Sequence, residues 1–426
     1  MSPKEVSMKK KSSPKPDEKK AGKDKGKRGR VWQTLAMPLL AIFTGLLVGA
    51  IVIVVTDANV IEAYRNFFHD PLGAIGLTFQ TIFVAYGALF SGALGSPVRI
   101  FTAFQTLFST GNGEPLLRAF WPLTESLVAA TPYILAGLAV SIGFKAGLFN
   151  IGAEGQFMMG ALGSAWVGYA FHLPWYLHLP LALLGGALAG AIWAFIPGYL
   201  KAVTGAHEVV NSIMMNYIAF RLSDWLLNGP MKATGYRPIT PVIDPTANLP
   251  AFFPDPVRLN LGFIVALLVA VFVYWLLFKT TFGFEVRAVG TNPDAAKYSG
   301  MNVPRNIVLV MCLSGALAGL GGATQVLGVD HWVGQGFSAG YGFDSIAIAL
   351  LGKSHPLGVV LSALLWGALR NGATKMQSMA GIPIDIVSII QGLVIVFIAA
   401  PAIIRWLYRI RTLKAEEVVL TRGWGR

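Results

Sequence analysis

The chain has 426 residues, of which 54% are hydrophobic and only 13% are charged, and its mean hydropathy is +0.59. A soluble protein of this length needs more charge on its surface, so the composition predicts a protein that crosses a membrane several times. The net charge of +13 does not indicate a nucleic-acid-binding protein. Most of the excess, +8, lies in residues 1–30, where no aromatic side chain interleaves the charges.

The two ends of the chain are expected to be tails. Residues 1–30 contain almost no apolar side chains, which predicts a disordered, basic cytoplasmic tail that lipids attract. A second cytoplasmic tail is expected over 413–426, and the membrane domain between them spans 31–412. The single cysteine, Cys312, lies in an apolar run, so disulfides and thiolate metal sites are excluded.

A bilayer crossing needs about 20 largely apolar residues. Nine windows meet this length or nearly do: 32–55, 125–144, 150–171, 175–198, 207–227, 261–278, 306–328, 356–370 and 384–405. Residues 342–352 are too short to cross as a full helix, and a broken helix inside the bundle is expected there. The predicted fold is an all-α polytopic membrane protein with about ten transmembrane crossings, one of them short or broken, and with both termini cytoplasmic.

The distribution of Lys and Arg supports this count. With the N-terminus inside, 25 of the 34 Lys and Arg residues fall on the inner side, eight fall outside and Arg221 lies within a span. External loops are then expected over 57–124 and 228–260. The apolar segment 71–95 is interpreted as an external, re-entrant or interfacial helix. One more crossing would reverse the membrane orientation of every later span. Glycine-rich stretches at 185–190 and 315–322 are expected to pack helices closely.

The sequence motifs of enzymes and of nucleotide-hydrolysing domains are incomplete. The sequence GKS at 352–354 lacks the Gly that a phosphate loop requires at position 347, which is Ala347. The Gly-rich sequence 334–340 is expected to be an external loop. The six histidines are scattered, which makes a metal site improbable. No catalytic residue, metal site or cofactor is therefore predicted for this chain.

Polar side chains occur inside two of the expected spans. Asn150 and Glu154 lie on the same face of a helix, with Gln156 on its flank. Glu154 either lies at the cytoplasmic end, where it bonds to a neighbouring helix or caps a broken span, or the group lines a substrate pathway. For Asn211 and Asn216, interhelical hydrogen bonds and substrate contact remain equal alternatives.

The short helix near 342–352 begins with two further candidates. Asp344 is expected to cap this helix as its N-terminal residue. Phe343 is a possible aromatic contact for a substrate. A short helix of this kind can also direct its amide end at a translocation path.

The longest internal polar segment, 281–306, contains signals for a short helix. Asn292 is the expected cap, Pro293 the first helical residue and Gly300 the stop. Flanked by Arg287 and Lys297, such a helix favours docking to a soluble partner, and the alternative is a linker.

Four of these stretches together resemble a known family. The sequences GLFNIGAEGQFMMGA, HEVVNSIMMNYIA, FEVRAVGTNPDAAKYSGMNV and GFDSIAIALLG resemble permease subunits of bacterial ABC importers of the ribose and branched-chain amino acid type. Within that group they are most similar to the nucleoside (simple-sugar) branch. The resemblance covers about residues 125–410 and the first span. The segment 60–118 is longer than the family pattern, and the Lys-rich tail has no counterpart there.

The resemblance implies a multi-subunit pump in the bacterial plasma membrane that imports nucleosides, with purine nucleosides as the expected substrates. A cytoplasmic ATPase subunit, which would bind ATP and magnesium, would dock on the loop 279–305. A second related permease and an external substrate-binding lipoprotein would complete the importer. The family's coupling positions fall on Arg287, Gly290, Asn292, Ala295, Ala296 and Gly300. The expected pathway positions are Asn150, Glu154, Gln156, Asn211, Asn216 and Phe343.

Two alternatives remain open. A permease for a simple, ribose-like sugar is the nearest one. An ion-coupled secondary carrier would need an intramembrane carboxylate, for which Glu154 is the strong candidate. Such a carrier would have no use for a docking helix at 292–300.

Overall fold

The fold consists of helices. The computed structural model describes residues 39–409, and in that part of the chain no segment forms a strand. Two isolated β-bridges pair Ile239 with Gly334 and Ala251 with Asn260. The all-α prediction is therefore confirmed.

The helices follow one another closely, apart from the longer non-helical connections 229–244, 248–260 and 331–340. The first half of the described chain contains Leu39–Thr56, α2 (Ala58–Arg65), α3 (Pro71–Leu94), α4 (Pro97–Thr110), α5 (Glu114–Lys145), α6 (Ala153–Ala170), α7 (Trp175–Thr204) and α8 (Glu208–Asn228). The second half contains the 3-10 helix η1 (Pro245–Ala247), α9 (Leu261–Lys279), α10 (Thr281–Thr291), α11 (Pro293–Tyr298), α12 (Val303–Gln325), the π-helix η2 (Val326–Asp330), α13 (Tyr341–Leu351), α14 (Pro356–Ala380), α15 (Ile384–Ala399) and α16 (Pro401–Leu407).

Six of these helices are long and apolar enough to cross a membrane: Leu39–Thr56, α3, α5, α7, α9, and α12 extended by η2. The pair α15 and α16 adds a seventh only if it is taken as one span. α6, α8 and α14 reach 18, 21 and 25 residues with less apolar sequences. About ten crossings with cytoplasmic termini therefore stays a prediction, and the expected tails 1–30 and 413–426 lie outside the described residues.

The expected span 384–405 is not one continuous helix. α15 and α16 meet at a bend of 88°. Pro401 begins α16, and a proline both lacks the backbone N–H and clashes with the preceding turn. The chain therefore turns sharply at Ala400.

The segment 57–124, expected as an external loop, is mostly helical. It holds α2, α3, α4 and the first turns of α5, which begins at Glu114. The side chain of Asp70 caps α3 by accepting the amide of Gly73 at 2.9 Å, and α3 continues for 24 residues. It packs along α14 and against α5. Its interpretation as a re-entrant or interfacial helix stays a prediction, because its length and composition also suit a crossing.

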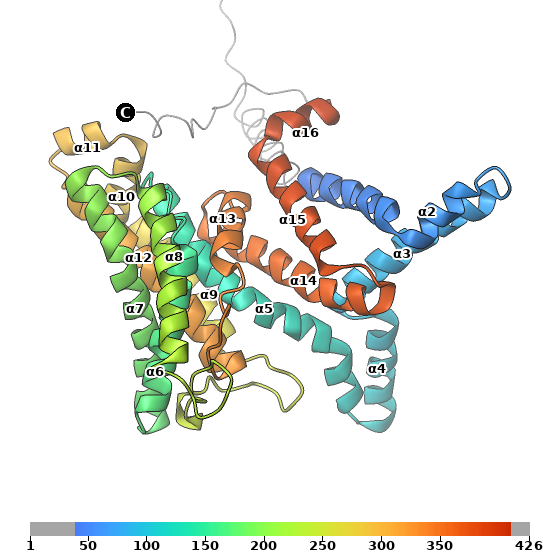
Figure 1. The fold of residues 1–426 in the computed structure, drawn as a ribbon, viewed down its shortest axis with the longest axis horizontal. Helices are drawn as coiled ribbons and strands as arrows, with labels where there is room; N and C mark the ends of the chain where they lie inside the picture. Colours follow the sequence, from blue (N-terminus) through green and yellow to red (C-terminus); the bar gives the residue numbers. More distant parts are fainter. Residues whose placement is uncertain (1–38, 410–426) are drawn as a thin grey trace, which may run out of the picture.

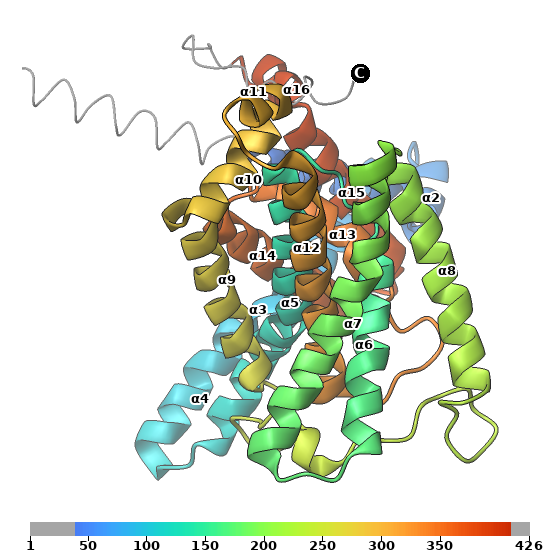
Figure 2. The ribbon, with the colours of Figure 1, turned by 90° about the vertical axis from the view of Figure 1, so that its left-hand side faces the viewer.

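Two groups of helices meet at α5. On one side, α7 packs along α12 and α6, and α9, α12, α7, α6 and α8 stand side by side (Figure 2). On the other side, α14 packs against α5 and α3 (Figure 1). α5 contacts both α12 and α14, so its residues form much of the largest buried apolar cluster.

Small residues bring α7, α12 and α6 into backbone contact. A Cβ atom on Gly190 of α7 would overlap the carbonyl oxygen of Gly315 in α12. One on Gly160 of α6 would overlap the backbone of Gly319. The packing function predicted for the two glycine-rich stretches is therefore confirmed.

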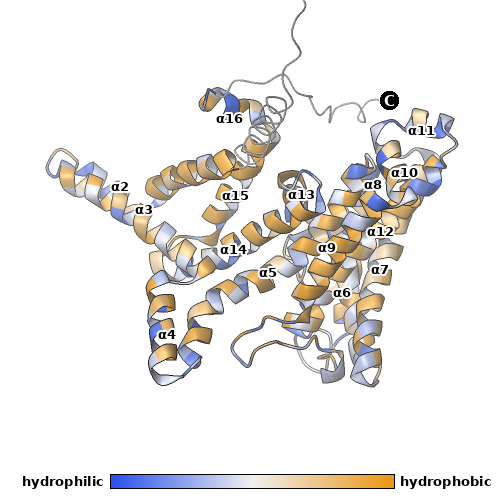
Figure 3. Ribbon diagram, turned by 180° about the vertical axis from the view of Figure 1, so that it is seen from behind, coloured by the Kyte–Doolittle hydropathy of each residue, from blue (hydrophilic) through white to orange (hydrophobic). Residues whose placement is uncertain are grey.

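The two ends of the bundle differ. α10 and α11 project from one end, and the connection between α8 and α9 covers the opposite end (Figure 1). Figure 3 shows apolar residues along α9 and α12 and polar residues over α10 and α11. The 228–260 segment is held to the bundle by backbone hydrogen bonds of 2.8 Å from Asp244 to Gly168 and from Leu249 to Leu327.

Candidate translocation site

The chain re-enters the helix bundle between α5 and α6. α5 ends at Lys145, and α6 begins at Ala153, three residues later than expected. Asn150, in this connection, contacts Ser314, which lies eleven residues (314 − 303) or about 16 Å into α12. The connection 146–152 therefore lies inside the bundle, and α6 starts there.

Asn150 and Gln156 form a closed pair inside the bundle. Asn150 Nδ2 donates to Gln156 Oε1 at 2.8 Å and to Ser314 Oγ at 2.9 Å. Gln156 Nε2 donates back to Asn150 Oδ1 at 3.1 Å, and the same oxygen accepts the Gly152 amide at 3.0 Å. Ser314 donates onward to the Ala139 carbonyl at 2.7 Å. The pair thus links α5, α6 and α12, and its polar atoms are satisfied, as burial demands.

Asn216 joins α8 to the start of α6. Its Oδ1 accepts the Gly155 amide at 2.9 Å, and its Nδ2 donates to the Ile151 carbonyl at 3.0 Å. The interhelical alternative therefore holds for Asn216. Asn211 differs, because its buried Nδ2 has no hydrogen-bond partner. Substrate contact by either side chain stays a prediction.

Glu154 closes the N-terminus of α13. Its carboxylate accepts the backbone amides of Gly340 at 2.9 Å, Gly342 at 2.6 Å and Phe343 at 3.3 Å. The first amides of a helix have no partner within the helix and carry partial positive charge, so a carboxylate satisfies both needs. α13 has only eleven residues, about 16 Å, which explains why a buried group must cap it. Glu154 thus stabilises a helix break, and a pathway function for it stays a prediction.

The segment before α13 runs inward. Gly334 pairs with Ile239 near the end of the bundle, whereas Gly340 reaches Glu154. A Cβ atom on Gly342 would overlap the Glu154 backbone, so only glycine allows this approach. The expectation that 334–340 is an external loop is therefore wrong, because its last residues lie against α6.

Asp344 does not cap α13, which corrects the expectation for this residue. No side chain of α13 itself caps its N-terminus, because Glu154 already occupies the amides. Asp344 Oδ2 instead accepts the Tyr133 hydroxyl at 2.8 Å and lies 3.7 Å from Arg370 Nη1. Arg370 also donates to the Tyr133 oxygen at 2.6 Å, and its Cζ lies 5.0 Å from the ring centroid of Tyr341. We call Asp344, Arg370, Tyr133 and Tyr341 the α13 cluster.

One side of the α13 cluster is exposed. The side chains of Arg370 and Asp344 are 39% and 34% exposed, and the neighbouring Phe343 is 45% exposed. Tyr133 and Arg370 were not among the site residues predicted from the sequence. Arg370 carried a signal, since it is a charged residue within apolar sequence, but the span was expected to end there, whereas α14 continues to Ala380.

The α11 helix begins and ends as the sequence predicts. Asn292 Oδ1 accepts the amides of Asp294 and Ala295, both at 3.1 Å, and Pro293 is the first helical residue. At the other end, Gly300 has a φ of +84°, and the Met301 amide donates to the Ala296 carbonyl at 3.0 Å, as in a Schellman motif. The predicted cap and stop are therefore confirmed.

Gly290 presses α10 against the end of α5. A Cβ atom on Gly290 would overlap the Lys145 carbonyl oxygen. One on Gly147 would lie 3.2 Å from the Gly290 Cα. Gly147 itself has a φ of +70°, which favours glycine. The projecting end is thereby joined to the connection that carries Asn150.

The other expected coupling residues divide into inward and outward positions. Ala296 is buried and Arg287 lies 5.2 Å from the Phe278 ring centroid, so both help to fix the helices. Ala295 is exposed, and Tyr298 is 96% exposed. The free surface of α11 is therefore small and partly aromatic.

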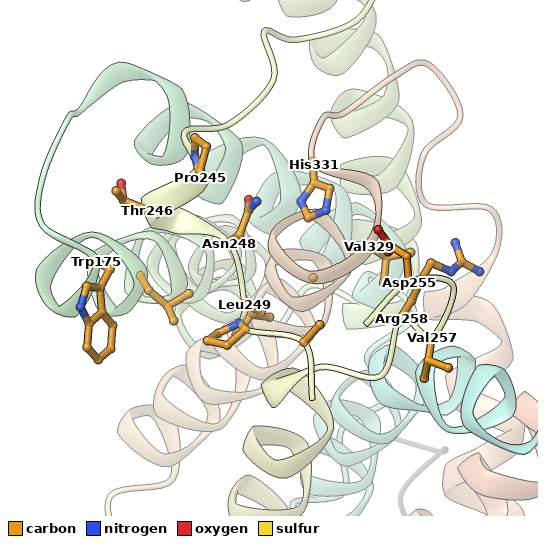
Figure 4. A pocket seen from close by; sticks show the side chains of 14 residues that line it. Trp175, Pro245, Thr246, Asn248, Leu249, Asp255, Val257, Arg258, Val329 and His331 are labelled. Carbon is orange, nitrogen blue, oxygen red and sulfur yellow. The ribbon is translucent and has the colours of Figure 1, made fainter. Parts of the chain in front are cut away.

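A pocket of about 540 Å³ lies at the end opposite α10 and α11 (Figure 4). Trp175 lies on one side of it, and Asp255 and Arg258 lie on the other. Arg258 pairs with Glu125 of α5, and this hydrogen bond raises the pKa of Arg258. Burial lowers the pKa of His331, which also lines the pocket. Within 39–409, no group of three or more His, Cys, Asp or Glu residues could hold a metal ion.

Comparison with known proteins places the chain in a family. The family model for the permease component of the branched-chain amino acid transport system matches residues 123–399. The chain is similar to the guanosine ABC transporter permease protein NupP of Bacillus subtilis, with 39% identity over 87% of this chain and 95% of that protein. No solved structure matches.

Two further relatives cover nearly the same length. The glucose ABC transporter permease protein TsgB13 of Haloferax volcanii is 34% identical over 86% of this chain and 87% of that protein. The nucleoside ABC transporter permease protein NupB of Lactococcus lactis is 33% identical over 91% of this chain and 97% of that protein. The family match and these relatives show that the chain belongs to the permease components of the branched-chain amino acid transport type and is a transport subunit, not an enzyme.

Proposed function

We propose that this chain is the membrane-spanning subunit of an ATP-driven importer that brings nucleosides into the cell, with purine nucleosides as the preferred class. Two of the three relatives carry a nucleoside or guanosine name, and the most similar of the three is the guanosine permease. The glucose permease at 34% identity keeps a simple sugar as the alternative substrate.

The observation that carries an ATP-driven mechanism is the capped helix α11 at one end of the bundle. We propose that Ala295 and Tyr298 contact the cytoplasmic ATPase subunit, which would bind ATP and magnesium. Arg287, Gly290, Asn292, Ala296 and Gly300 then hold this surface in place. Their geometry supports this division, because Asn292 and Gly300 form the two caps and Ala296 is buried.

The contacts also support a route for coupling. A movement of α11 would pass through α10 to the Gly290–Gly147 contact and on to the connection that carries Asn150. Four residues after Asn150, Glu154 holds the N-terminus of α13. α13 is thus the short element that the docking end could reposition.

The remaining features support the orientation. Lys145, Arg287 and Lys297 belong to the end with α10 and α11, so the positive-inside rule favours this end as cytoplasmic. We further propose about ten crossings, with both termini on that side. The opposite end, with its pocket, would face outward in the bacterial inner membrane and receive the substrate-binding lipoprotein.

A second related permease completes the proposal. The exposed side of α13 carries Phe343 and Asp344, and a pathway wall needs a facing surface. An ion-coupled carrier is disfavoured, because the carboxylate of Glu154 is held by three backbone amides.

The test is recovery of the partner subunits. The tagged chain is purified in mild detergent from its own membrane, and co-purifying chains are identified. An ATPase subunit is expected, and Ala295→Arg should lose it by placing a long charged side chain on the free surface of α11. The matched control is Ala58→Arg, an exposed alanine in α2. A chain that arrives alone and moves solute under an ion gradient overturns the proposal.

A further inference from the structure

We propose that the α13 cluster and Phe343 form the substrate-binding station within the membrane, with Asp344 taking the vicinal hydroxyls of ribose and Phe343 stacking on the base. This inference rests on the proposed function and names residues for it, of which only Phe343 was among the pathway positions expected from the sequence.

The α13 cluster lies near the middle of α5. Tyr133 lies twelve residues (145 − 133) from the end of α5 and nineteen (133 − 114) from its start, or about 18 and 29 Å. Asp344 is in the first turn of α13, whose N-terminus meets Glu154 inside the bundle. A hydrocarbon core is about 30 Å thick. The cluster therefore lies at membrane depth.

The α13 cluster is partly exposed. Charged side chains facing hydrocarbon are costly, and those found at membrane depth face a polar cavity or another chain. Arg370 and Asp344 nevertheless keep 39% and 34% of their side chains exposed in this chain alone. We place their exposed surfaces on the polar pathway, because the exposed Phe343 next to Asp344 provides an aromatic face for a ligand on the same helix.

The charges of the α13 cluster favour a neutral ligand. A free helix N-terminus would attract an anion, but the α13 amides are already taken by Glu154. The positive Arg370 is likewise balanced by Asp344. The station thus offers a carboxylate, a guanidinium and aromatic rings without a free positive end, which suits a neutral, hydroxylated molecule with a flat ring. A nucleoside has these features.

Contacts within the α13 cluster hold its side chains in a fixed geometry. Tyr133 bonds to both Asp344 and Arg370, and Arg370 lies over the Tyr341 ring. These contacts fix the carboxylate and the guanidinium before a substrate arrives. A carboxylate accepts two neighbouring hydroxyl donors at once, whereas a 2′-deoxynucleoside leaves one acceptor position empty. Discrimination between ribose and deoxyribose is the direct consequence.

The experiment measures this discrimination. The full importer complex is reconstituted in vesicles, and ATP-driven uptake of guanosine and 2′-deoxyguanosine is compared. The wild-type complex should prefer guanosine by roughly 10-fold or more, as a hydrogen bond to a charged group gives. Asp344→Asn should lose most of that preference. Asp224→Asn is the matched control, because Asp224 is also paired with an arginine, 3.9 Å from Arg221, but lies on α8.

A second variant guards against misfolding of the first. Phe343→Leu keeps an apolar side chain at an exposed position, and it should raise the KM for guanosine by about 10-fold through lost stacking. If wild-type uptake of guanosine is normal but both variants keep the preference and the KM, the station is overturned and the proposed function stands. A parallel loss of both uptakes in Asp344→Asn, with an unchanged KM in Phe343→Leu, also overturns it. A wild-type complex that imports no nucleoside overturns both.

Discussion

Gly147 and Gly290 lie backbone against backbone, so close that a Cβ atom on Gly147 would be 3.2 Å from the Gly290 Cα. Gly147 belongs to the connection that re-enters the bundle, and Gly290 belongs to the last turn of α10. This contact joins the projecting end of the molecule to the polar groups at membrane depth.

Gly290→Ala should move α10 away from Gly147. The new methyl group would overlap the Lys145 carbonyl, and overpacking of this kind costs about 1–3 kcal/mol. We expect a lower melting temperature and a several-fold loss of ATP-driven uptake. Gly87→Ala is the control, because nothing lies within 4 Å of a Cβ atom there. Equal uptake in the two variants would show that the close approach is not needed.

Glu154→Gln tests the cap of α13. The change keeps the size of the side chain but removes its charge, and the new amide group would face backbone donors. Since hydrogen bonds to a charged group are worth about 1.5–3 kcal/mol, we expect a loss of stability of that order. Thermal unfolding in detergent measures it, with the exposed Glu62→Gln as control. Glu154→Ala should lower ATP-driven uptake while the complex still assembles, and normal uptake in that variant would reject a pathway function.

Asn150→Ala and Asn211→Ala should differ in stability. Asn150 satisfies Gln156, Ser314 and Gly152, so its removal leaves buried polar groups unpaired at a cost of about 1–3 kcal/mol each. Asn211 has no partner for its Nδ2, so its removal should leave the melting temperature nearly unchanged. If Asn211 contacts the substrate, uptake falls all the same. Similar melting temperatures for both variants would contradict the network.

Arg258→Gln tests how the outer loop is fixed. Glu125 keeps only 10% of its side chain exposed, and losing its partner leaves a nearly buried charge. Because Arg258 is itself half exposed, we expect a modest loss of about 1–2 kcal/mol. Limited proteolysis should cut the 228–260 segment faster than in the control Arg221→Gln, whose arginine is 89% exposed. An unchanged cutting rate would mean that the backbone bonds alone hold the segment.

Local signals in the sequence were sufficient for some elements. The cap, first residue and stop of α11 depend on neighbouring residues, so Asn292, Pro293 and Gly300 could be assigned correctly. The close packing of the glycine-rich stretches also followed from composition. Of the two alternatives for Asn150, Glu154 and Gln156, contacts with neighbouring helices are seen, and a pathway function for them stays a prediction.

Contacts between distant parts of the chain could not be predicted. Glu154 meets Gly342 across 188 positions, and Arg370 meets Tyr133 across 237. No periodicity encodes such pairs, so Asp344 was assigned to the cap that Glu154 in fact provides. The boundaries of α14 and the break at Ala400 were missed because apolar composition does not show where a helix bends.

The central claim is ATP-driven nucleoside import, and the most direct measurement is uptake of radiolabelled guanosine into vesicles that contain the complete complex. The account predicts saturable uptake that requires ATP, survives collapse of proton and sodium gradients, and is not reduced by excess glucose. Uptake of glucose instead of guanosine, or guanosine uptake driven by an ion gradient without ATP, would contradict it.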